Sequence, residues 1–280
     1  MESARHALSG PRRLVAAALT AACVLIPQAA GASSSEEGRK LYELHCASCH
    51  GAGGDGEGPA AYLLYPKPRN FREAIYRLRS TPSGALPLDD DLTRTVRLGL
   101  PGTAMPAFGD LLTPEQIALL IAEVKSLSPA FESAEPLDPV SVPPAPEKTH
   151  ELVANGRKVY EKLGCASCHG TDGRGDGPAS VSLKDSHGYP LPARDFTRGV
   201  FKSGSRPEDI YRTLVTGMDG AAMPSFAQML DPASGLFDFD EAGWALVYYL
   251  RSLQPSPEDR GVGAGARIAV GRVESIRLLR

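Results

Sequence analysis

The 280-residue sequence has few cysteines, no apolar run long enough to cross a bilayer and no stripe of basic residues. The apolar run at residues 14–26 is well short of the ~20 residues that a membrane-spanning helix needs. Four of the five cysteines form two Cys-x-x-Cys pairs and leave only Cys23, which excludes a framework of disulfides. A net charge of −3 without a basic stripe argues against nucleic acid as a partner.

The N-terminal segment, residues 1–32, has the layout of a secretory signal peptide. Arginines precede the apolar run, and small residues follow it, so we expect cleavage after Ala30 or Ala32. Export predicts a periplasmic protein with no membrane span in its mature form. A lipoprotein cut before Cys23 is the alternative, although the residues before Cys23 match such a site poorly.

Cys-Ala-Ser-Cys-His occurs twice, at residues 46–50 and 165–169. Two thiols three positions apart suit the two vinyl groups of one haem, and the adjacent histidine can ligate its iron, so each copy predicts a covalent haem c. The alternatives are a zinc site that draws both motifs together and a disulfide within each motif. Zinc would leave two histidines unused, and such a disulfide would close only a small loop.

An internal repeat surrounds these motifs. Gly-Arg-Lys-Leu-Tyr at residues 38–42 recurs as Gly-Arg-Lys-Val-Tyr at 156–160, and Gly-Thr-Ala-Met-Pro-Ala-Phe at 102–108 recurs as Gly-Ala-Ala-Met-Pro-Ser-Phe at 220–226. The chain is therefore interpreted as a tandem duplication of one domain.

Six prolines between residues 129 and 148 exclude a helix in that stretch and predict an extended linker. The predicted organisation follows, with the role of the last segment left open: signal peptide 1–32, domain 1 at 36–128, linker 129–148, domain 2 at 149–253 and a C-terminal extension at 254–280. Capping residues at Ser35, Thr113 and Thr149 and helical spacing of apolar residues predict helices over four stretches: 36–45, 113–127, 151–163 and 240–253.

The order of helix, Cys-x-x-Cys-His, glycine-rich loop, helix, Met-Pro loop and closing helix resembles a class I cytochrome c domain, present here twice. The resemblance covers nearly all of residues 36–253 and implies an all-α fold in which each domain wraps around one haem c. It implies His50 and His169 as proximal iron ligands and a methionine as the distal ligand of each iron.

The repeat indicates which methionines these are. Met105 and Met223 occupy equivalent places, whereas Met218 aligns with Leu100 and is the alternative for the second iron. The resemblance further suggests that a carbonyl near Pro59 or Pro178 accepts the proton of the proximal imidazole. Arg69 and Arg194 are candidates to hold a haem propionate, with solvated surface charges as the alternative. The covalent haem attachments are expected at Cys46, Cys49, Cys165 and Cys168.

Two irons with both axial positions filled leave no site for substrate chemistry, which favours an electron carrier over an enzyme. The expected partners are redox proteins: a donor dehydrogenase and an acceptor oxidase or reductase. A dihaem peroxidase, which needs one open iron, and a haem subunit of a larger dehydrogenase complex are the alternatives.

Overall fold

The computed structural model describes residues 35–254, which lie within one compact unit. The predicted signal peptide and most of the predicted C-terminal extension lie outside these residues. We call residues 36–128 lobe 1 and residues 149–253 lobe 2. The described part of the chain is helical, with one isolated β-bridge and no extended strand, so the all-α prediction is confirmed.

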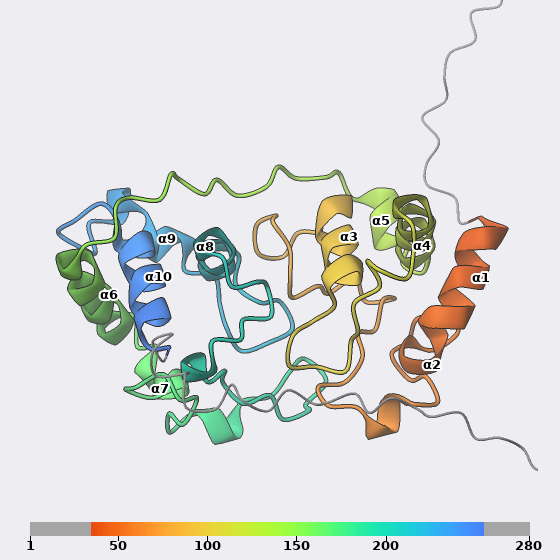
Figure 1. Ribbon diagram of the computed structural model, residues 1–280, viewed down its shortest axis with the longest axis horizontal. Helices are drawn as coiled ribbons and strands as arrows, with labels where there is room; N and C mark the ends of the chain where they lie inside the picture. Colours follow the sequence, from red (N-terminus) through yellow and green to blue (C-terminus); the bar gives the residue numbers. More distant parts are fainter. Residues whose placement is uncertain (1–34, 255–280) are drawn as a thin grey trace, which may run out of the picture. The chain divides into compact units, whose positions relative to one another are not determined.

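The helices of lobe 1 recur in the same order in lobe 2, which adds the one-turn helix α9 (Ala227–Leu230) (Figure 1). Lobe 1 contains α1 (Glu36–His45), α2 (Ala47–His50), α3 (Asp89–Leu98) and α4 (Pro114–Ser126). Lobe 2 contains α6 (His150–Lys162), α7 (Ala166–His169), α8 (Pro207–Thr216), α9 (Ala227–Leu230) and α10 (Ala242–Ser252). The short 3₁₀ helices are η1 (Ala61–Leu63), η2 (Ser180–Ser182), η3 (Phe196–Arg198) and η4 (Pro232–Ser234).

The predicted capping residues begin the long helices. The hydroxyl of Ser35 accepts from Gly38 N and begins α1, and the hydroxyl of Thr149 accepts from Leu152 N and begins α6. Thr113 begins α4 in the same way, with a proline at the first helical position. The four predicted helices therefore form, with bounds shifted by no more than two residues.

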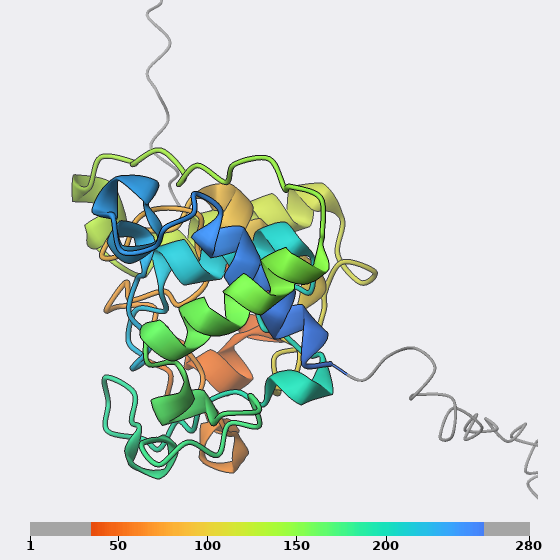
Figure 2. The same cartoon turned by 90° about the vertical axis from the view of Figure 1, so that its left-hand side faces the viewer.

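The first and last long helices of each lobe pack closely against each other, and in lobe 2 α6 crosses α10 (Figure 2). The glycine of the repeated Gly-Arg-Lys motif lies at each crossing. A Cβ at Gly38 would lie 2.7 Å from Leu119 O in α4, and one at Gly156 would lie 1.9 Å from Ala245 O in α10. Because any side chain would force these helices apart, the repeated glycines fix how closely they approach.

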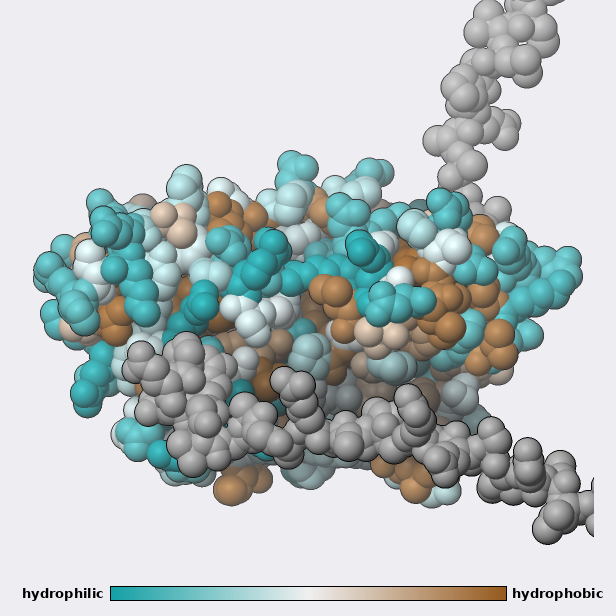
Figure 3. Space-filling model, viewed as in Figure 1, coloured by the Kyte–Doolittle hydropathy of each residue, from teal (hydrophilic) through white to brown (hydrophobic). Residues whose placement is uncertain are grey.

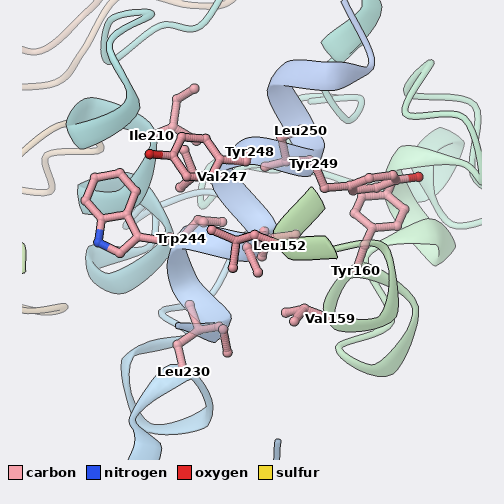
Figure 4. Packing of buried hydrophobic residues seen from close by; sticks show 14 of the residues in the cluster. Leu152, Val159, Tyr160, Ile210, Leu230, Trp244, Val247, Tyr248, Tyr249 and Leu250 are labelled. Atoms are coloured by element: carbon pink, nitrogen blue, oxygen red, sulfur yellow. The ribbon is translucent and has the colours of Figure 1, made fainter. Parts of the chain in front are cut away.

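Each lobe has its own hydrophobic core. The core of lobe 1 centres on Tyr42, Ile117, Leu120 and Ile121. The core of lobe 2 is larger and surrounds α10, with Tyr160 and Tyr249 in aromatic contact at 5.3 Å between ring centroids (Figure 4). Two separate cores are what a tandem duplication requires, because each copy of the repeat must bury its own apolar face.

The stretch between the lobes departs from the prediction at its start. One helical turn, α5 (Ala130–Ser133), forms directly after Pro129, so the expectation of no helix over residues 129–148 is wrong there. Proline is compatible with the beginning of a helix, and the next proline is Pro136. Beyond it the chain is extended, and Val140 N donates to Ser80 O at 2.7 Å.

No helix within residues 35–254 is both long and apolar enough to cross a membrane. On the face seen in Figure 3, hydrophobic residues lie at the bottom of a recess behind a rim of polar residues. Each haem motif lies on a one-turn helix, α2 or α7, and both Met-Pro segments lie in loops between longer helices.

Candidate functional site

Each Cys-x-x-Cys-His motif forms one helical turn. His50 N donates to Cys46 O at 2.9 Å, and His169 N donates to Cys165 O at 2.8 Å. Positions i, i+3 and i+4 lie on one face of a helix, so the two thiols and the imidazole of each motif share a face. All four of these cysteines are free thiols, so neither motif closes a disulfide.

The two imidazoles are held in the same way. Their Nδ1 atoms contact backbone carbonyls: His50 meets Arg69 O at 2.9 Å, and His169 meets Arg194 O at 3.0 Å. Because a carbonyl oxygen can only accept, Nδ1 carries the proton and Nε2 keeps its lone pair for a ligand. The rings also stack on Phe71 and Phe196, at centroid distances of 4.5 and 4.3 Å.

These carbonyls correct one expectation from the resemblance. The acceptors belong to Arg69 and Arg194, not to residues near Pro59 and Pro178. The glycine-rich loop turns back tightly after each histidine, with Gly56 N donating to His50 O at 2.8 Å, so the acceptor comes from the segment that follows this loop. Burial lowers the pKa of both histidines, which keeps the imidazoles neutral and able to ligate a metal.

The two Met-Pro loops are closed by equivalent hydrogen bonds. Leu100 N donates to Met105 O at 3.1 Å, and Met218 N donates to Met223 O at 3.0 Å. Met105 packs against the core of lobe 1 and Met223 against the core of lobe 2. Met218, the alternative for the second iron, belongs to neither core, although it also lines the cavity between the loops.

A largely hydrophobic cavity of about 660 Å³ connects these groups. Its walls include all four motif cysteines, both motif histidines, Met105 and Met223, which come from both lobes. Burial raises the pKa of Cys46 to about 12 and that of Cys165 to about 11. The partly buried thiols, the Nε2 lone pairs and the apolar walls fit a flat hydrophobic macrocycle with a central metal.

Polar groups in the cavity wall fit the acidic edge of such a macrocycle. The buried Tyr76 hydroxyl and Arg77 Nε have no hydrogen-bond partner among the described residues. Arg69, Arg194 and Lys202 also line the cavity. Burial, with Arg77 as the next cause, lowers the pKa of Arg69 to about 10, and burial together with the nearby arginines lowers the pKa of Lys202 to about 8. Such partly buried cations suit the carboxylates of a haem.

Arg77 and Lys202 were not predicted from the sequence, although a signal for them exists. Phe71 and Tyr76 stack in lobe 1 as Phe196 and Phe201 do in lobe 2. In both lobes the residue after the second aromatic is a cation that lines the cavity, so alignment of these aromatic pairs finds Arg77 and Lys202.

The zinc alternative has no support in this geometry. Within residues 35–254 no group of three or more His, Cys, Asp or Glu side chains is placed to hold a metal ion. The two motifs instead face a cavity in which each histidine offers a single nitrogen.

Comparison with known proteins agrees with this chemistry. The Cytochrome c family model matches residues 35–128 and again residues 153–254. A Cbb3-type cytochrome c oxidase subunit FixP from Sinorhizobium medicae is 32% identical over 145 residues, covering 50% of this chain and 40% of the relative. A CcoP subunit of the same type from an Azospirillum species is 29% identical over 199 residues, covering 70% of this chain and 57% of the relative. The chain spans about half the length of these curated relatives.

One solved structure matches over more of its own length. It is a chain of the reducing HAO-like protein complex of Kuenenia stuttgartiensis, with 41% sequence identity and a TM-score of 0.75. The match covers 80% of this chain and 98% of that chain. The protein therefore belongs to the cytochrome c family, with two copies of the family's domain that together carry two haem c groups.

Proposed function

We propose that this protein is a periplasmic dihaem cytochrome that passes single electrons between a donor oxidoreductase and a downstream acceptor. The proposed covalent attachments are Cys46 and Cys49 in lobe 1 and Cys165 and Cys168 in lobe 2. The proposed axial ligand pairs are His50 with Met105 and His169 with Met223. Bound haem c supplies reversible one-electron chemistry.

The observation that carries the proposal is the equivalence of the two sites. In each lobe a carbonyl fixes the imidazole tautomer, and a closed turn carries a methionine that packs beside the core. Two sites that each offer one histidine and one methionine leave no coordination position for peroxide. This favours an electron carrier over the peroxidase alternative, which needs an open iron and an acid or base above it.

The methionine-to-iron charge-transfer band of the ferric protein tests the ligands. We expect two haems per chain, a band from each, and no change on addition of peroxide. Met105→Ala and Met223→Ala should each remove about half of the band, while Met218→Leu, the matched control, should retain all of it. Loss of half the band in Met218→Leu would assign that methionine to the second iron, and a peroxide-sensitive haem would favour the enzyme.

A second candidate is that the protein works as a fixed subunit of a multihaem oxidoreductase complex. The match to the Kuenenia stuttgartiensis chain favours it, because that chain is covered over 98% of its length and is part of a reducing HAO-like protein complex. Co-expression with an HAO-like protein from the same organism, followed by sedimentation, separates the two candidates. A stable assembly at nanomolar concentration supports the subunit, and separate sedimentation at micromolar concentration supports the free carrier.

A further inference from the structure

The Met-Pro loop of lobe 1 is contacted by an arginine of lobe 2. Arg194 Nη2 donates to Pro101 O at 3.1 Å, and Pro101 lies four positions before Met105. The loop leaves room for this contact at Gly102, where a Cβ would lie 3.0 Å from Arg194 Nη2. The guanidinium of Arg194 therefore lies directly against the backbone that leads to Met105.

The contacted backbone is the turn that sets the position of Met105. Thr103 N donates to Leu100 O, and Leu100 N donates to Met105 O, both at 3.1 Å. Pro101 and Gly102 form the central positions of this turn, and Gly102 has φ +73°, which favours glycine. A group that holds Pro101 O thus restrains the loop whose other end is Met105.

Arg194 also acts in its own lobe through a different atom. Its carbonyl oxygen accepts from His169 Nδ1 at 3.0 Å. The carbonyl of Arg194 therefore contacts His169 of lobe 2, and its guanidinium contacts the Met105 loop of lobe 1.

An arginine of lobe 1 makes the corresponding contact with the Met-Pro loop of lobe 2. Arg77 Nη2 donates to Gly220 O at 3.2 Å, three positions before Met223. Gly220 is the counterpart of Gly102 in the repeat. Each Met-Pro loop is therefore restrained at the same turn by a guanidinium from the other lobe.

We propose that Arg194 is a positioning residue for both haem sites, orienting His169 through its carbonyl and holding the Met105 loop through its guanidinium, with Arg77 as the reverse link. This inference rests on the proposed axial ligands. It makes methionine ligation in one lobe depend on a side chain from the other, so that a change in one site alters the stability of ligation in the second.

The test measures methionine ligation in lobe 1 alone. In a Met223→His background, lobe 2 no longer contributes a methionine band, so the remaining band reports Met105. Titration with imidazole displaces this methionine, and the midpoint measures how firmly the loop holds it. Adding Arg194→Lys keeps the positive charge but removes the planar donor, and we expect the imidazole midpoint to fall about fivefold, the effect of one net hydrogen bond.

Arg198→Lys is the matched control, since Arg198 lies four positions away, is exposed, and should leave the midpoint unchanged. An unchanged midpoint in Arg194→Lys overturns the inference while leaving the proposed ligands intact. Absence of any methionine band in the Met223→His parent overturns the ligands, and the inference with them.

A second variant covers the case in which Arg194→Lys does not fold. Arg77→Lys in a Met105→His background reads lobe 2 in the same way, and we again expect a midpoint several-fold lower than in the parent. If neither arginine alters ligation in the opposite lobe, the cross-lobe link is rejected.

Discussion

The two lobes share a repeat, yet they contribute opposite charges where they meet. Besides a contact at 3.1 Å between His187 of lobe 2 and Glu73 of lobe 1, three arginine–aspartate ion pairs join them, and in each the arginine belongs to lobe 1 and the aspartate to lobe 2. The pairs are Arg77 with Asp185, Arg79 with Asp219 and Arg94 with Asp209, at nitrogen–oxygen distances of 3.1, 2.9 and 2.7 Å. The copies have therefore diverged into complementary partners.

Two aspartates at equivalent positions of the repeat have different partners in the two lobes. Asp91 and Asp209 occupy the same place in the repeat. Asp91 accepts from Ser80 N and Oγ and from Leu88 N, all neutral donors of its own lobe. Asp209, only 1% exposed, instead binds three arginines from both lobes: Arg94, Arg206 and Arg212.

The space for this cluster depends on a glycine. Counted from the stacked aromatic pairs, Gly204 of lobe 2 corresponds to Arg79 of lobe 1. A Cβ at Gly204 would lie 2.4 Å from Asp209 Oδ2 and 2.5 Å from Arg94 Nη2. At this position lobe 1 therefore carries Arg79, which pairs with Asp219 of lobe 2. Lobe 2 carries Gly204, whose missing side chain leaves space for Arg94 of lobe 1. A second copy of either lobe could not replace its partner.

Removing Arg79 should have the largest effect on stability. Its guanidinium is fully buried, donates to Tyr76 O, Pro82 O and Thr216 O, and pairs with Asp219. Arg79→Ala leaves these acceptors unpaired, and we expect a loss of about 3–5 kcal/mol in the free energy of unfolding of the holoprotein.

Urea unfolding followed by far-ultraviolet circular dichroism measures this loss. Arg72→Ala is the control, since Arg72 is exposed and bonds only within lobe 1, and it should cost below about 1 kcal/mol. Equal losses of unfolding free energy in the two variants would show that the contacts of Arg79 with lobe 2 stabilise the protein no more than exposed contacts within lobe 1 do.

Asp209→Asn should have a smaller, pH-dependent effect. Burial alone raises the pKa of Asp209, but the hydrogen bond from Arg206 and the charge and hydrogen bond of Arg94 outweigh it and hold the pKa below the ordinary value of 3.8. The carboxylate therefore stabilises the folded state above pH 3.8 and loses this contribution as the pH falls further through the lowered pKa.

We expect Asp209→Asn to cost about 2–3 kcal/mol at pH 7, and the difference from the unsubstituted protein to shrink below pH 3.8. Asp91→Asn is the matched comparison and should cost about 1 kcal/mol, because an amide oxygen can still accept from neutral donors. Urea unfolding at several pH values checks both, and a difference that stays constant with pH would rule out the carboxylate as its source.

The smallest effects should be equal in the two lobes. Tyr42 and Tyr160 donate their hydroxyls to Gly51 O at 2.8 Å and Gly170 O at 2.6 Å, directly after each haem motif. Tyr42→Phe and Tyr160→Phe should each cost about 1 kcal/mol of unfolding free energy. The exposed Tyr62→Phe should cost nothing measurable, and clearly unequal effects of the first two would extend the divergence of the lobes to the haem motifs.

Features that depend on short spacings could be predicted from the sequence alone. The Cys-x-x-Cys-His turns, the caps at Ser35, Thr113 and Thr149, and the repeated Met-Pro loops are local, because residues a few positions apart must meet in any helix or turn. The duplicated motifs therefore predicted the two haems, and the resemblance to class I cytochrome c that they carry implied the all-α fold.

Contacts between segments that are distant in the chain depend on the tertiary fold and could not be predicted in this way. The carbonyls of Arg69 and Arg194 lie 19 and 25 positions from the histidines that they orient, and Arg194 Nη2 bonds a carbonyl 93 positions away. The burial of Arg79 likewise depends on lobe 2, and nothing in the neighbouring sequence distinguishes it from an exposed arginine of a loop. Burial and charge pairing depend on how the two lobes pack, and no pattern within one copy of the repeat records that packing.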